Sequence, residues 1–341
     1  MNQKTLYVGI DVSKEKLDVS LTFDGRSIYA SKSFSNNSCS FLNLTDWVKK
    51  QSRKVYCEKI HVCLESTGIY SEEIADYLQD QENTKVSVMN PSQIKAYGKS
   101  IMLRTKTDEV DAKLIAFFAY QVKPLERTKT QISLKEFRRL VRHLDYLIRR
   151  RADEKGHLET VKSAMILDSV NKIIASYDQQ IDEIKKIIKN HTERDEMLKR
   201  KIELLETIPG IGEATAQIIL SELQIESGND NISTKSQTAH AGLAPSQKIS
   251  GSSVRGKSKI CKTGNRRLRK CLYLPAMAAI RYNIVIGDFY KRLLEKGKPK
   301  KVALIAAMRK LLVIAIGVLN NQTPFDPLWN EKNRVNINKI S

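Results

Sequence analysis

Three features that would place this chain in a membrane or outside the cell are missing from its 341 residues. No apolar run approaches the ~20 uncharged residues that a membrane span needs. The first residues lack the charged, apolar and small-residue regions of a signal peptide. The five cysteines are odd in number and include no CxxC pair, which argues against a disulfide framework and a zinc site. These absences predict a cytoplasmic protein with reduced cysteines and no membrane contact.

Acidic residues are scarce in the last third of the chain. Residues 241–341 hold 21 Lys and Arg but four Asp and Glu, so this segment carries +17 of the total net charge of +20. Such asymmetry indicates a surface for a polyanion, most often nucleic acid. A basic face that serves solubility alone is the alternative. An anionic membrane is a poorer fit, because the basic residues do not lie opposite one clean apolar helical face with aromatic anchors.

Proline and glycine are almost absent from the middle of the chain. Between Pro124 and Pro209 there is no other proline, and Gly156 is the one glycine. Apolar residues recur there at steps of 3 and 4 in two stripes, which are Leu134, Phe137, Val141, Leu144 and Ile148, then Tyr177, Ile181, Ile184 and Ile188. This spacing predicts two long helices whose stripes are buried, either as an antiparallel hairpin or as a coiled coil between protomers.

The first 125 residues alternate between strand-like and helix-like patterns. Three consecutive strands are expected, followed by helix, strand, helix, strand and helix, with a tight turn at Asp24-Gly25 and a final helix from about Thr107. The pattern predicts a mixed sheet flanked by helices. With the chain longer than one core usually serves, we expect three domains, at residues 1–125, 130–205 and 206–330.

Four acidic residues are placed where one site could collect them. Asp11 and Glu65 end the first and fourth expected strands, and Asp108 and Asp111 share one face of a helical turn. If those two strands are neighbours in the sheet, the four carboxylates converge and repel one another. A bound divalent cation usually offsets such repulsion, and oxygen ligands favour Mg²⁺ or Mn²⁺. The alternative for Asp108 and Asp111 is a favourable position at the positive end of a helix dipole.

The segment IPGIGEATA, residues 208–216, fits a helix, a glycine hairpin and a second helix. Gly210 and Gly212 precede the second helix and would expose backbone N–H groups that can grip a phosphate. A tight turn that merely packs two helices explains the same pattern.

Serine, lysine and arginine crowd the loop that follows. Its serines are Ser246, Ser250, Ser252, Ser253 and Ser258, and their chemistry alone does not rank them as nucleophiles. Cations close by in the chain would stabilise the charge that develops when a hydroxyl attacks a phosphodiester. The expected nucleic-acid contacts of this region are Arg255, Lys257, Lys259, Lys262, Arg266, Arg267, Arg269 and Lys270. A loop that contacts phosphates without a covalent role is the alternative.

Several motifs together resemble one family. VGIDVSKEKLDV, CLESTGIY, NPSQIKAYGKS, RTKTDEVDAKLIA, IPGIGEATA and HAGLAPSQKISGSSVRG are similar to the DEDD transposases of bacterial insertion sequences, relatives of the Piv-type DNA invertases. The resemblance implies an α/β ribonuclease H/RuvC-like N-terminal domain, a helical coiled-coil middle and a mainly α C-terminal domain. It also implies a metal-binding tetrad on Asp11, Glu65, Asp108 and Asp111. The nucleophilic serine of the family's Ser-Gly pair falls on Ser250.

The same resemblance implies a DNA recombinase that moves or inverts an element. Its partners would be DNA and a guide RNA from the element. It would assemble with further copies of itself as a dimer or tetramer, and it would act at the nucleoid in a bacterial cytoplasm. A junction-resolving, metal-dependent nuclease without a covalent intermediate remains an alternative. So does a non-catalytic architectural DNA binder. A sugar-kinase or actin-like ATPase would need a glycine-rich phosphate loop, which SKEKLDVS lacks.

Overall fold

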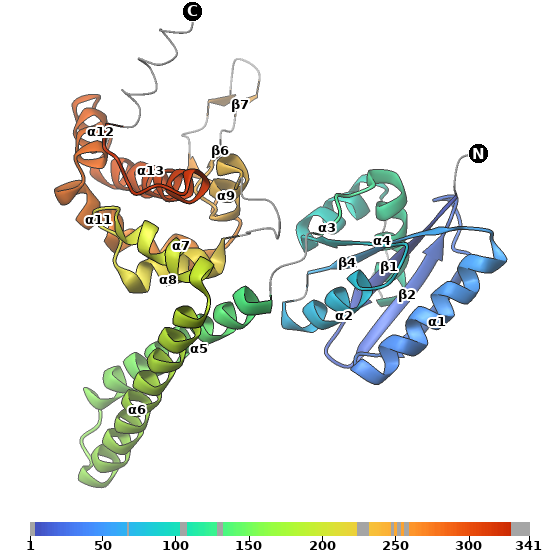
Figure 1. Ribbon diagram of the computed structural model, residues 1–341, viewed down its shortest axis with the longest axis horizontal. Coiled ribbons are helices and arrows are strands. Elements are labelled where there is room, and N and C mark those ends of the chain that lie inside the picture. Colours follow the sequence, from blue (N-terminus) through green and yellow to red (C-terminus); the bar gives the residue numbers. More distant parts are fainter. Residues whose placement is uncertain are drawn as a thin grey trace, which may run out of the picture. The chain divides into compact units, whose positions relative to one another are not determined.

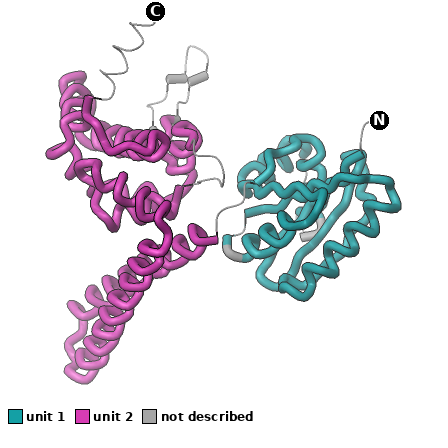
Figure 2. Tube along the Cα trace, viewed as in Figure 1, with its two compact units in different colours: residues 1–129 teal, residues 130–341 magenta. Residues whose placement is uncertain are grey.

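The computed structural model describes residues 4–66, 68–102, 108–127, 132–223, 232–246, 249–250, 254–255 and 259–328. The chain divides into two compact units, Met1–Lys129 and Thr130–Ser341 (Figure 2). The first is a sheet with helices on both faces, and the second is almost entirely helical (Figure 1).

The first unit is built on a five-stranded sheet in the order β3-β2-β1-β4-β5. β1 pairs antiparallel with β2 and parallel with β4. The strands are β1 (Thr5–Val12), β2 (Lys16–Thr22), β3 (Ala30–Ser35), β4 (Lys59–Glu65) and β5 (Thr84–Met89), and the helices are α1 (Ser38–Lys54), α2 (Ile69–Gln79), α3 (Pro91–Ser100) and α4 (Asp108–Val122). The predicted mixed α/β domain is therefore confirmed, with a strand order consistent with the ribonuclease H/RuvC-like fold.

Alternation along β1 separates the two faces of this sheet. Leu6, Val8 and Ile10 are buried in the core that α1 and α2 cover. Tyr7 lies on the opposite face, in the core that α3 and α4 cover. Every second residue of β1 therefore faces α4.

Gly9 brings β1 and α4 unusually close. A Cβ atom on Gly9 would lie 2.2 Å from the backbone nitrogen of Ala116 and 2.3 Å from the carbonyl oxygen of Ala112. Neither backbone atom can move without shifting α4 as a whole. Glycine at this position thus fixes the height at which α4 crosses the sheet.

Two local features differ from the sequence prediction. β3 begins at Ala30, because Asp24 Oδ1 accepts hydrogen bonds from the backbone N–H groups of Arg26 (2.9 Å) and Ser27 (3.0 Å) and widens the turn. Helix α3 was not predicted. Asn90 caps it by accepting a hydrogen bond from the Ser92 N–H at 2.9 Å, and Pro91 occupies its first turn.

The end of the first unit is fastened by Arg127. Its backbone N–H donates to the carbonyl of Val86 at 2.6 Å, and its Nη1 lies 2.8 Å from Oδ1 of Asp76. The chain is therefore held against β5 and α2 at this point.

The second unit begins with a helical arm, α5 (Ile132–Leu158) and α6 (Ala164–Arg194), which pack against each other. Arg151 Nη1 meets Asp178 Oδ1 at 2.5 Å near one end, and Ser133 Oγ donates to Asp195 Oδ2 at 2.6 Å near the other. These contacts define an antiparallel hairpin within one chain. From the predicted stripes, Leu134, Phe137, Val141, Ile181 and Ile188 are buried, whereas Ile148 is 39% exposed.

The remaining helices form the C-terminal part of the same unit. They are α7 (Glu196–Glu206), α8 (Glu213–Glu222), α9 (Thr234–His240), α10 (Arg266–Cys271), α11 (Tyr273–Tyr282), α12 (Ile284–Glu295) and α13 (Lys300–Asn321). Two short antiparallel pairs lie between α9 and α10, namely β6 (Pro245–Ser246) with β9 (Lys259–Ile260), and β7 (Ile249–Ser250) with β8 (Val254–Arg255).

α13 supplies much of the core of this part. Leu311, Leu312, Ala315 and Ile316 are fully buried, and α13 packs against α7, α9, α11 and α12. Among the described residues it is the one helix long and apolar enough to cross a membrane by length and composition, and half of its most apolar stretch is buried inside the protein.

Candidate carboxylate site and nucleic-acid interface

The register of the sheet places Asp11 beside Glu65. Ile10 of β1 pairs with Leu64 of β4 in a parallel ladder, so the next step along both strands sets Asp11 against Glu65. Gly9 and Cys63, two residues earlier on each strand, lie on the face that α4 covers. Asp11 and Glu65 therefore project from this same face, and both are half-buried.

Helix α4 runs back along β1 with its first turn at the Asp11 end. Tyr120 of α4 stacks edge-on against Tyr7 at 5.2 Å between ring centroids, while Ala112 lies over Gly9. Continuing in the same direction brings Asp111 toward the end of the strand. Asp111 is half-buried. Asp108 begins α4, and its side chain lies outside the described part of the structure.

The donor chemistry of these residues suits a hard divalent cation. Every side chain of the predicted tetrad offers carboxylate oxygens, the ligands that Mg²⁺ and Mn²⁺ prefer. Among the side chains that the structure describes, no three Asp, Glu, His or Cys residues are gathered closely enough to hold a metal ion. Asp11, Glu65 and Asp111 therefore fit such an ion by the type of their ligand atoms but are not gathered around one position, and the side chain of Asp108 lies outside that test.

A further carboxylate, Asp18, was missed by the sequence analysis. Asp18 of β2 is the direct Cα partner of Asp11 and is buried, with 7% exposure. Lys16 Nζ lies 2.9 Å from Asp18 Oδ1, and the Ser33 hydroxyl donates to the same oxygen. Two carboxylates directly opposite each other repel, and Lys16 offsets that repulsion. The signal was available, since pairing the first two strands across a short turn aligns these two positions.

Ser250 lies in the second unit, on β7. It is the Cα partner of Val254 in β8, and Ile249 is the partner of Arg255. The backbone of Lys259 belongs to β9, where it pairs with Ser246. The side chains of Ser246, Ser250, Arg255 and Lys259 lie outside the described part of the structure, as do Lys257 and the remaining serines of the loop. The described backbone of this serine-rich loop therefore consists of two short antiparallel strand pairs, β6 with β9 and β7 with β8.

The two glycines of the predicted phosphate hairpin have different surroundings. Gly210 adopts a positive φ of 104°, and a Cβ there would lie 2.8 Å from both N and Cβ of Ala279 in α11. Gly212 caps the start of α8, and within the described structure a Cβ on it would meet no atom within 4 Å. Gly210 therefore permits close helix packing, while Gly212 leaves room beside the start of α8.

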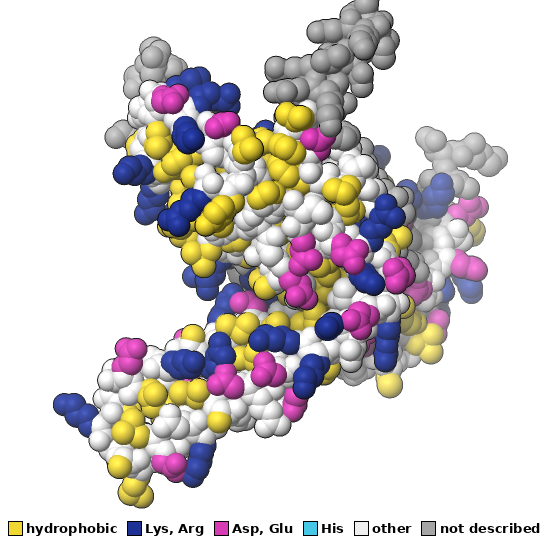
Figure 3. All heavy atoms as spheres, turned by 60° about the vertical axis from the view of Figure 1, so that its left-hand side comes forward, with side chains coloured by type: hydrophobic (Ala, Val, Ile, Leu, Met, Phe, Trp, Pro, Cys, Tyr) yellow, Lys and Arg dark blue, Asp and Glu magenta, His cyan; other side chains and the backbone are white. Residues whose placement is uncertain are grey.

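The predicted basic contacts also divide into two groups. Lys262, Arg266 and Lys270 are exposed. Arg269 is half-buried and donates from Nη1 to the carbonyl of Ala241 at 2.9 Å. Arg267 is half-buried between Asp145 (3.6 Å) and Glu222 (3.8 Å). Figure 3 shows basic (dark blue) and acidic (magenta) side chains among hydrophobic ones (yellow) on one face of this unit.

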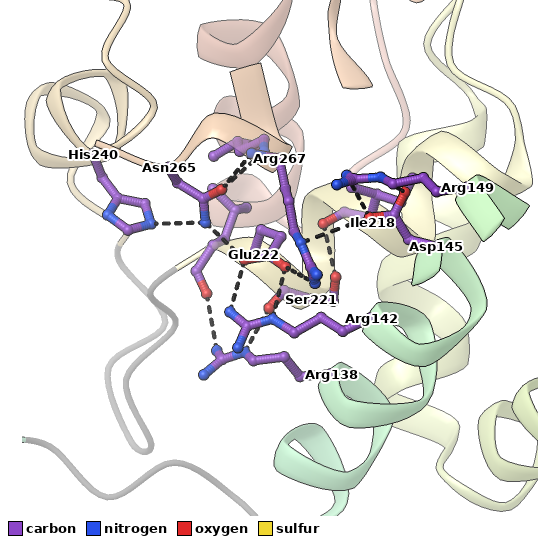
Figure 4. A network of polar contacts seen from close by, with 12 residues as sticks. Arg138, Arg142, Asp145, Arg149, Ile218, Ser221, Glu222, His240, Asn265 and Arg267 are labelled. Carbon is purple, nitrogen blue, oxygen red and sulfur yellow. Dashed lines mark hydrogen bonds and ion pairs between the residues drawn. The ribbon is translucent and has the colours of Figure 1, made fainter. Parts of the chain in front are cut away.

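Glu222 is the centre of a polar network that the sequence did not reveal (Figure 4). Its side chain is 2% exposed and accepts two hydrogen bonds from Arg142 and one from Asn265 Nδ2 at 2.7 Å. Burial raises the pKa of this carboxyl, but the hydrogen bonds from Arg142 and Asn265 lower it more, so the net pKa lies below its ordinary value. Glu222 therefore stays ionised and ties α5 to α8 and α10.

Two family models match this chain in regions that together span both units. Residues 8–165 match a DEDD model of the IS110 type described as "Transposase". Residues 202–291 match a model described as "Transposase IS116/IS110/IS902 family". Both describe transposases, a class of DNA-rearranging enzymes.

Curated relatives agree with these matches. The chain is 34% identical over 338 residues to the pilin gene-inverting protein of Moraxella bovis, covering 95% of this chain and 99% of that protein. The homologue of Moraxella lacunata gives the same identity and coverage. The transposase for insertion sequence element IS1328 of Yersinia enterocolitica is 38% identical over 97 residues, 28% of this chain and 26% of that protein. The chain belongs to the IS110-type family of DEDD transposases.

Proposed function

We propose that this protein cuts and rejoins the DNA strands of an insertion element. Ser250 would be the nucleophile, and a divalent metal bound by carboxylates would assist the reaction. The observation that carries the proposal is the side-by-side placement of Asp11 and Glu65 on the sheet face that α4 covers. The basic last third of the chain supports a nucleic-acid substrate.

Asp11, Glu65, Asp108 and Asp111 are the residues that would hold Mg²⁺ or Mn²⁺. The bound ion would supply charge stabilisation for the attacking and leaving oxygens of a phosphodiester. The carboxylates themselves have the task of fixing its position. Gly9 supports that task, because it sets the distance between α4 and β1.

The hydroxyl of Ser250 would attack the phosphorus of a DNA strand. One P–O bond to the deoxyribose breaks, the departing oxygen takes up a proton as a hydroxyl, and a phosphoserine ester retains the energy of the broken bond. Attack by the hydroxyl of another strand then releases the serine and completes the exchange. Arg255, Lys257 and Lys259 are close along the chain and would stabilise the developing charge.

The remaining parts of the proposal rest on the family resemblance. A guide RNA from the element would select the DNA sites, and the protein would act as a homo-oligomer. The +17 surplus of residues 241–341 is compatible with contacts to both kinds of nucleic acid.

Substitution of the nucleophile tests the proposal. The full-length protein, with Mg²⁺ and a supercoiled plasmid carrying the element with its noncoding flanks, should form a covalent protein–DNA adduct that denaturing gels resolve. Ser250→Ala should abolish both the adduct and strand exchange, whereas Ser252→Ala serves as the matched control and should retain both. Asp11→Asn should also abolish them. Full strand cleavage by Ser250→Ala without any adduct would instead identify a metal-dependent nuclease.

A further inference from the structure

Helices α10 and α11 form one nearly continuous amphipathic rod. Leu272, the single residue between them, keeps a right-handed helical backbone with φ −78° and ψ −10°. Leu268 and Ala279 point inward and are fully buried. The outward side chains recur at steps of four, four, three and four, and we call these exposed residues the α10–α11 face, which comprises Arg266, Lys270, Leu274, Met277 and Arg281.

This face combines positive charge with exposed apolar surface. Leu274 is 71% exposed and Met277 is 40% exposed, and Tyr273 beside them is 46% exposed. The sequence contains no Asp or Glu between residues 241 and 287, so the rod contributes no carboxylate that could neutralise Arg266, Lys270 or Arg281. An anionic partner with apolar parts would match both properties.

A pocket of about 290 Å³ adjoins the face and is partly walled by Lys270 and Leu274. Val141 of α5 and Ile218 of α8 give it an apolar lining, and Arg149 lies at its charged side. Its two acidic residues are occupied, since Asp145 pairs with Arg149 at 2.6 Å and Glu222 pairs with Arg142 at 2.9 Å.

Arg267 also lines this pocket. Within the described part of the chain, its Nη1 is buried and has no hydrogen-bond partner, although it lies 3.8 Å from Glu222 Oε1. A buried donor of this kind is costly unless an acceptor reaches it. The carbonyl oxygens and ring nitrogens of nucleobases are such acceptors.

We propose that the α10–α11 face and the adjoining pocket bind an unpaired stretch of nucleic acid. Arg266, Lys270 and Arg281 contact its phosphates, while Leu274, Met277 and Tyr273 receive its bases, one of which enters the pocket. This inference deepens the nucleic-acid binding in the proposed function and rests on it for the identity of the partner.

The apolar centre of the face distinguishes unpaired strands from a duplex. A duplex keeps its bases stacked inside and presents a charged backbone, which would cover Leu274 and Met277 with polar groups. Unpaired bases expose flat apolar faces that bind aromatic and apolar side chains. A second copy of this chain is a poor occupant, because an isologous contact would set the same three cations against themselves.

Fluorescence anisotropy on the full-length protein separates the apolar and electrostatic contributions to nucleic-acid binding. The probes are fluorescein-labelled 20-mers of oligo(U) and oligo(dT), which have no secondary structure, and a 20-base-pair DNA duplex, each titrated between 50 and 300 mM KCl. The paired variant Leu274→Ala/Met277→Ala should weaken binding of one or both unpaired probes by about 5–30-fold and change duplex binding less than about twofold. Its salt dependence should match that of the parent protein. Comparison of oligo(U) with oligo(dT) tells whether RNA or DNA is preferred.

Charge substitutions should behave differently. Lys270→Ala and Arg281→Ala should each lower the slope of log affinity against log salt by about 0.7 on the unpaired probes, as expected for one lost phosphate contact. Leu125→Ala and Lys50→Ala are the matched controls, because both side chains are exposed in the first unit. They should change neither the affinity for the unpaired probes nor the salt slope.

The inference is overturned if the Leu274/Met277 variant binds unpaired probes as the parent protein does, or loses duplex binding equally. It is also overturned if sedimentation velocity shows that this variant loses self-association instead, because the face would then contact another copy. Strand exchange is not part of this assay. If the parent protein recombines DNA but these variants bind the probes normally, only this inference is refuted. If the variants lose binding as expected but the parent protein does not recombine DNA, only the proposed chemistry is refuted.

Discussion

Arg142 and Glu222 are joined by two parallel hydrogen bonds, from Nε to Oε1 at 2.9 Å and from Nη2 to Oε2 at 2.9 Å. Arg142 belongs to α5 and Glu222 lies at the end of α8, so the pair fastens the arm to the C-terminal helices. Such bidentate geometry is the strongest form of arginine–carboxylate contact.

Removal of Arg142 should be costly because Glu222 would remain buried and charged. Breaking a fully buried pair costs about 3–5 kcal/mol, and since Arg142 is 38% exposed, water screens it and we expect about 2 kcal/mol for Arg142→Ala. Urea unfolding measures this loss. Arg149→Ala is the matched control, because its partner Asp145 lies on the same helix and Arg149 is 45% exposed. Equal losses in the two variants would show that the Glu222 pair has no special role.

The ionisation of Glu222 should make the stability of the second unit depend on pH. The folded pKa lies below the ordinary value of 4.5, so the charged form is favoured in the folded protein. Its stabilisation is fully present above about pH 4.5 and is lost as pH falls below that value. The free energy of unfolding should therefore fall more between pH 5 and pH 3 in the parent protein than in Glu222→Gln. Parallel curves for the two proteins would contradict the depressed pKa.

His61 should give the first unit a separate pH dependence at higher pH. Burial, and secondarily the charge of Lys85, lower the pKa of His61 below 6.5, and Ser87 Oγ lies 2.8 Å from its Nε2. Because protonation is disfavoured in the folded state, the stabilisation is complete above pH 6.5 and is lost as pH falls below it. His61→Gln should flatten thermal unfolding temperatures between pH 7 and pH 5. An unchanged pH profile in this variant would indicate that His61 titrates normally.

Two glycine substitutions should shift stability in opposite directions. Gly9→Ala forces a methyl group against the backbone of Ala116 and Ala112, and overpacking of this kind costs typically about 1–3 kcal/mol. Gly156→Ala, in the arm helix α5 with no described atom near its Cβ position, should stabilise by about 0.5–1 kcal/mol. Chemical denaturation of both variants measures the contrast. Gly9→Ala should also reduce recombination, because α4 carries Asp111.

Neutralising Asp11 should leave the protein folded but unresponsive to magnesium. Asp11 faces Asp18 across the β1–β2 ladder and lies beside Glu65, so Asp11→Asn relieves like-charge repulsion and should not lower the melting temperature measured in EDTA. Added Mg²⁺ should raise the melting temperature of the parent protein, since a ligand of the folded state stabilises it. The variant should lose this rise, whereas the exposed Asp46→Asn should keep it. The same rise in Asp11→Asn would place the metal elsewhere.

Much of the first unit followed from local patterns, and its omissions have identifiable causes. The short apolar runs of β1 and β4 were enough to predict buried strands that end at or near Asp11 and Glu65. Helix α3 was not predicted, although Asn90 followed by Pro91 is a typical helix start. Its short apolar pattern gave no stronger signal.

The role of Glu222 could not be predicted from sequence. Arg142 precedes it by 80 residues and Asn265 follows it by 43, and a single acid in an ordinary helix carries no local sign of such partners. The difference in exposure among Arg266, Arg267, Arg269 and Lys270 could not be predicted either. All four are basic, and only the packing of α10 determines which of them turn inward. Charge alone therefore overestimated how many of them are exposed to a partner.

Helix α5 is shared between the arm and the body of the second unit. Near its start Phe137 and Val141 are buried in the core formed with α8, and toward its end Arg151 pairs with Asp178 of α6. At 27 residues and about 1.5 Å of rise per residue it is a rod of about 40 Å, uninterrupted by proline. One uninterrupted helix therefore connects the turn between α5 and α6 to the Arg142–Glu222 pair and to the pocket that both residues line.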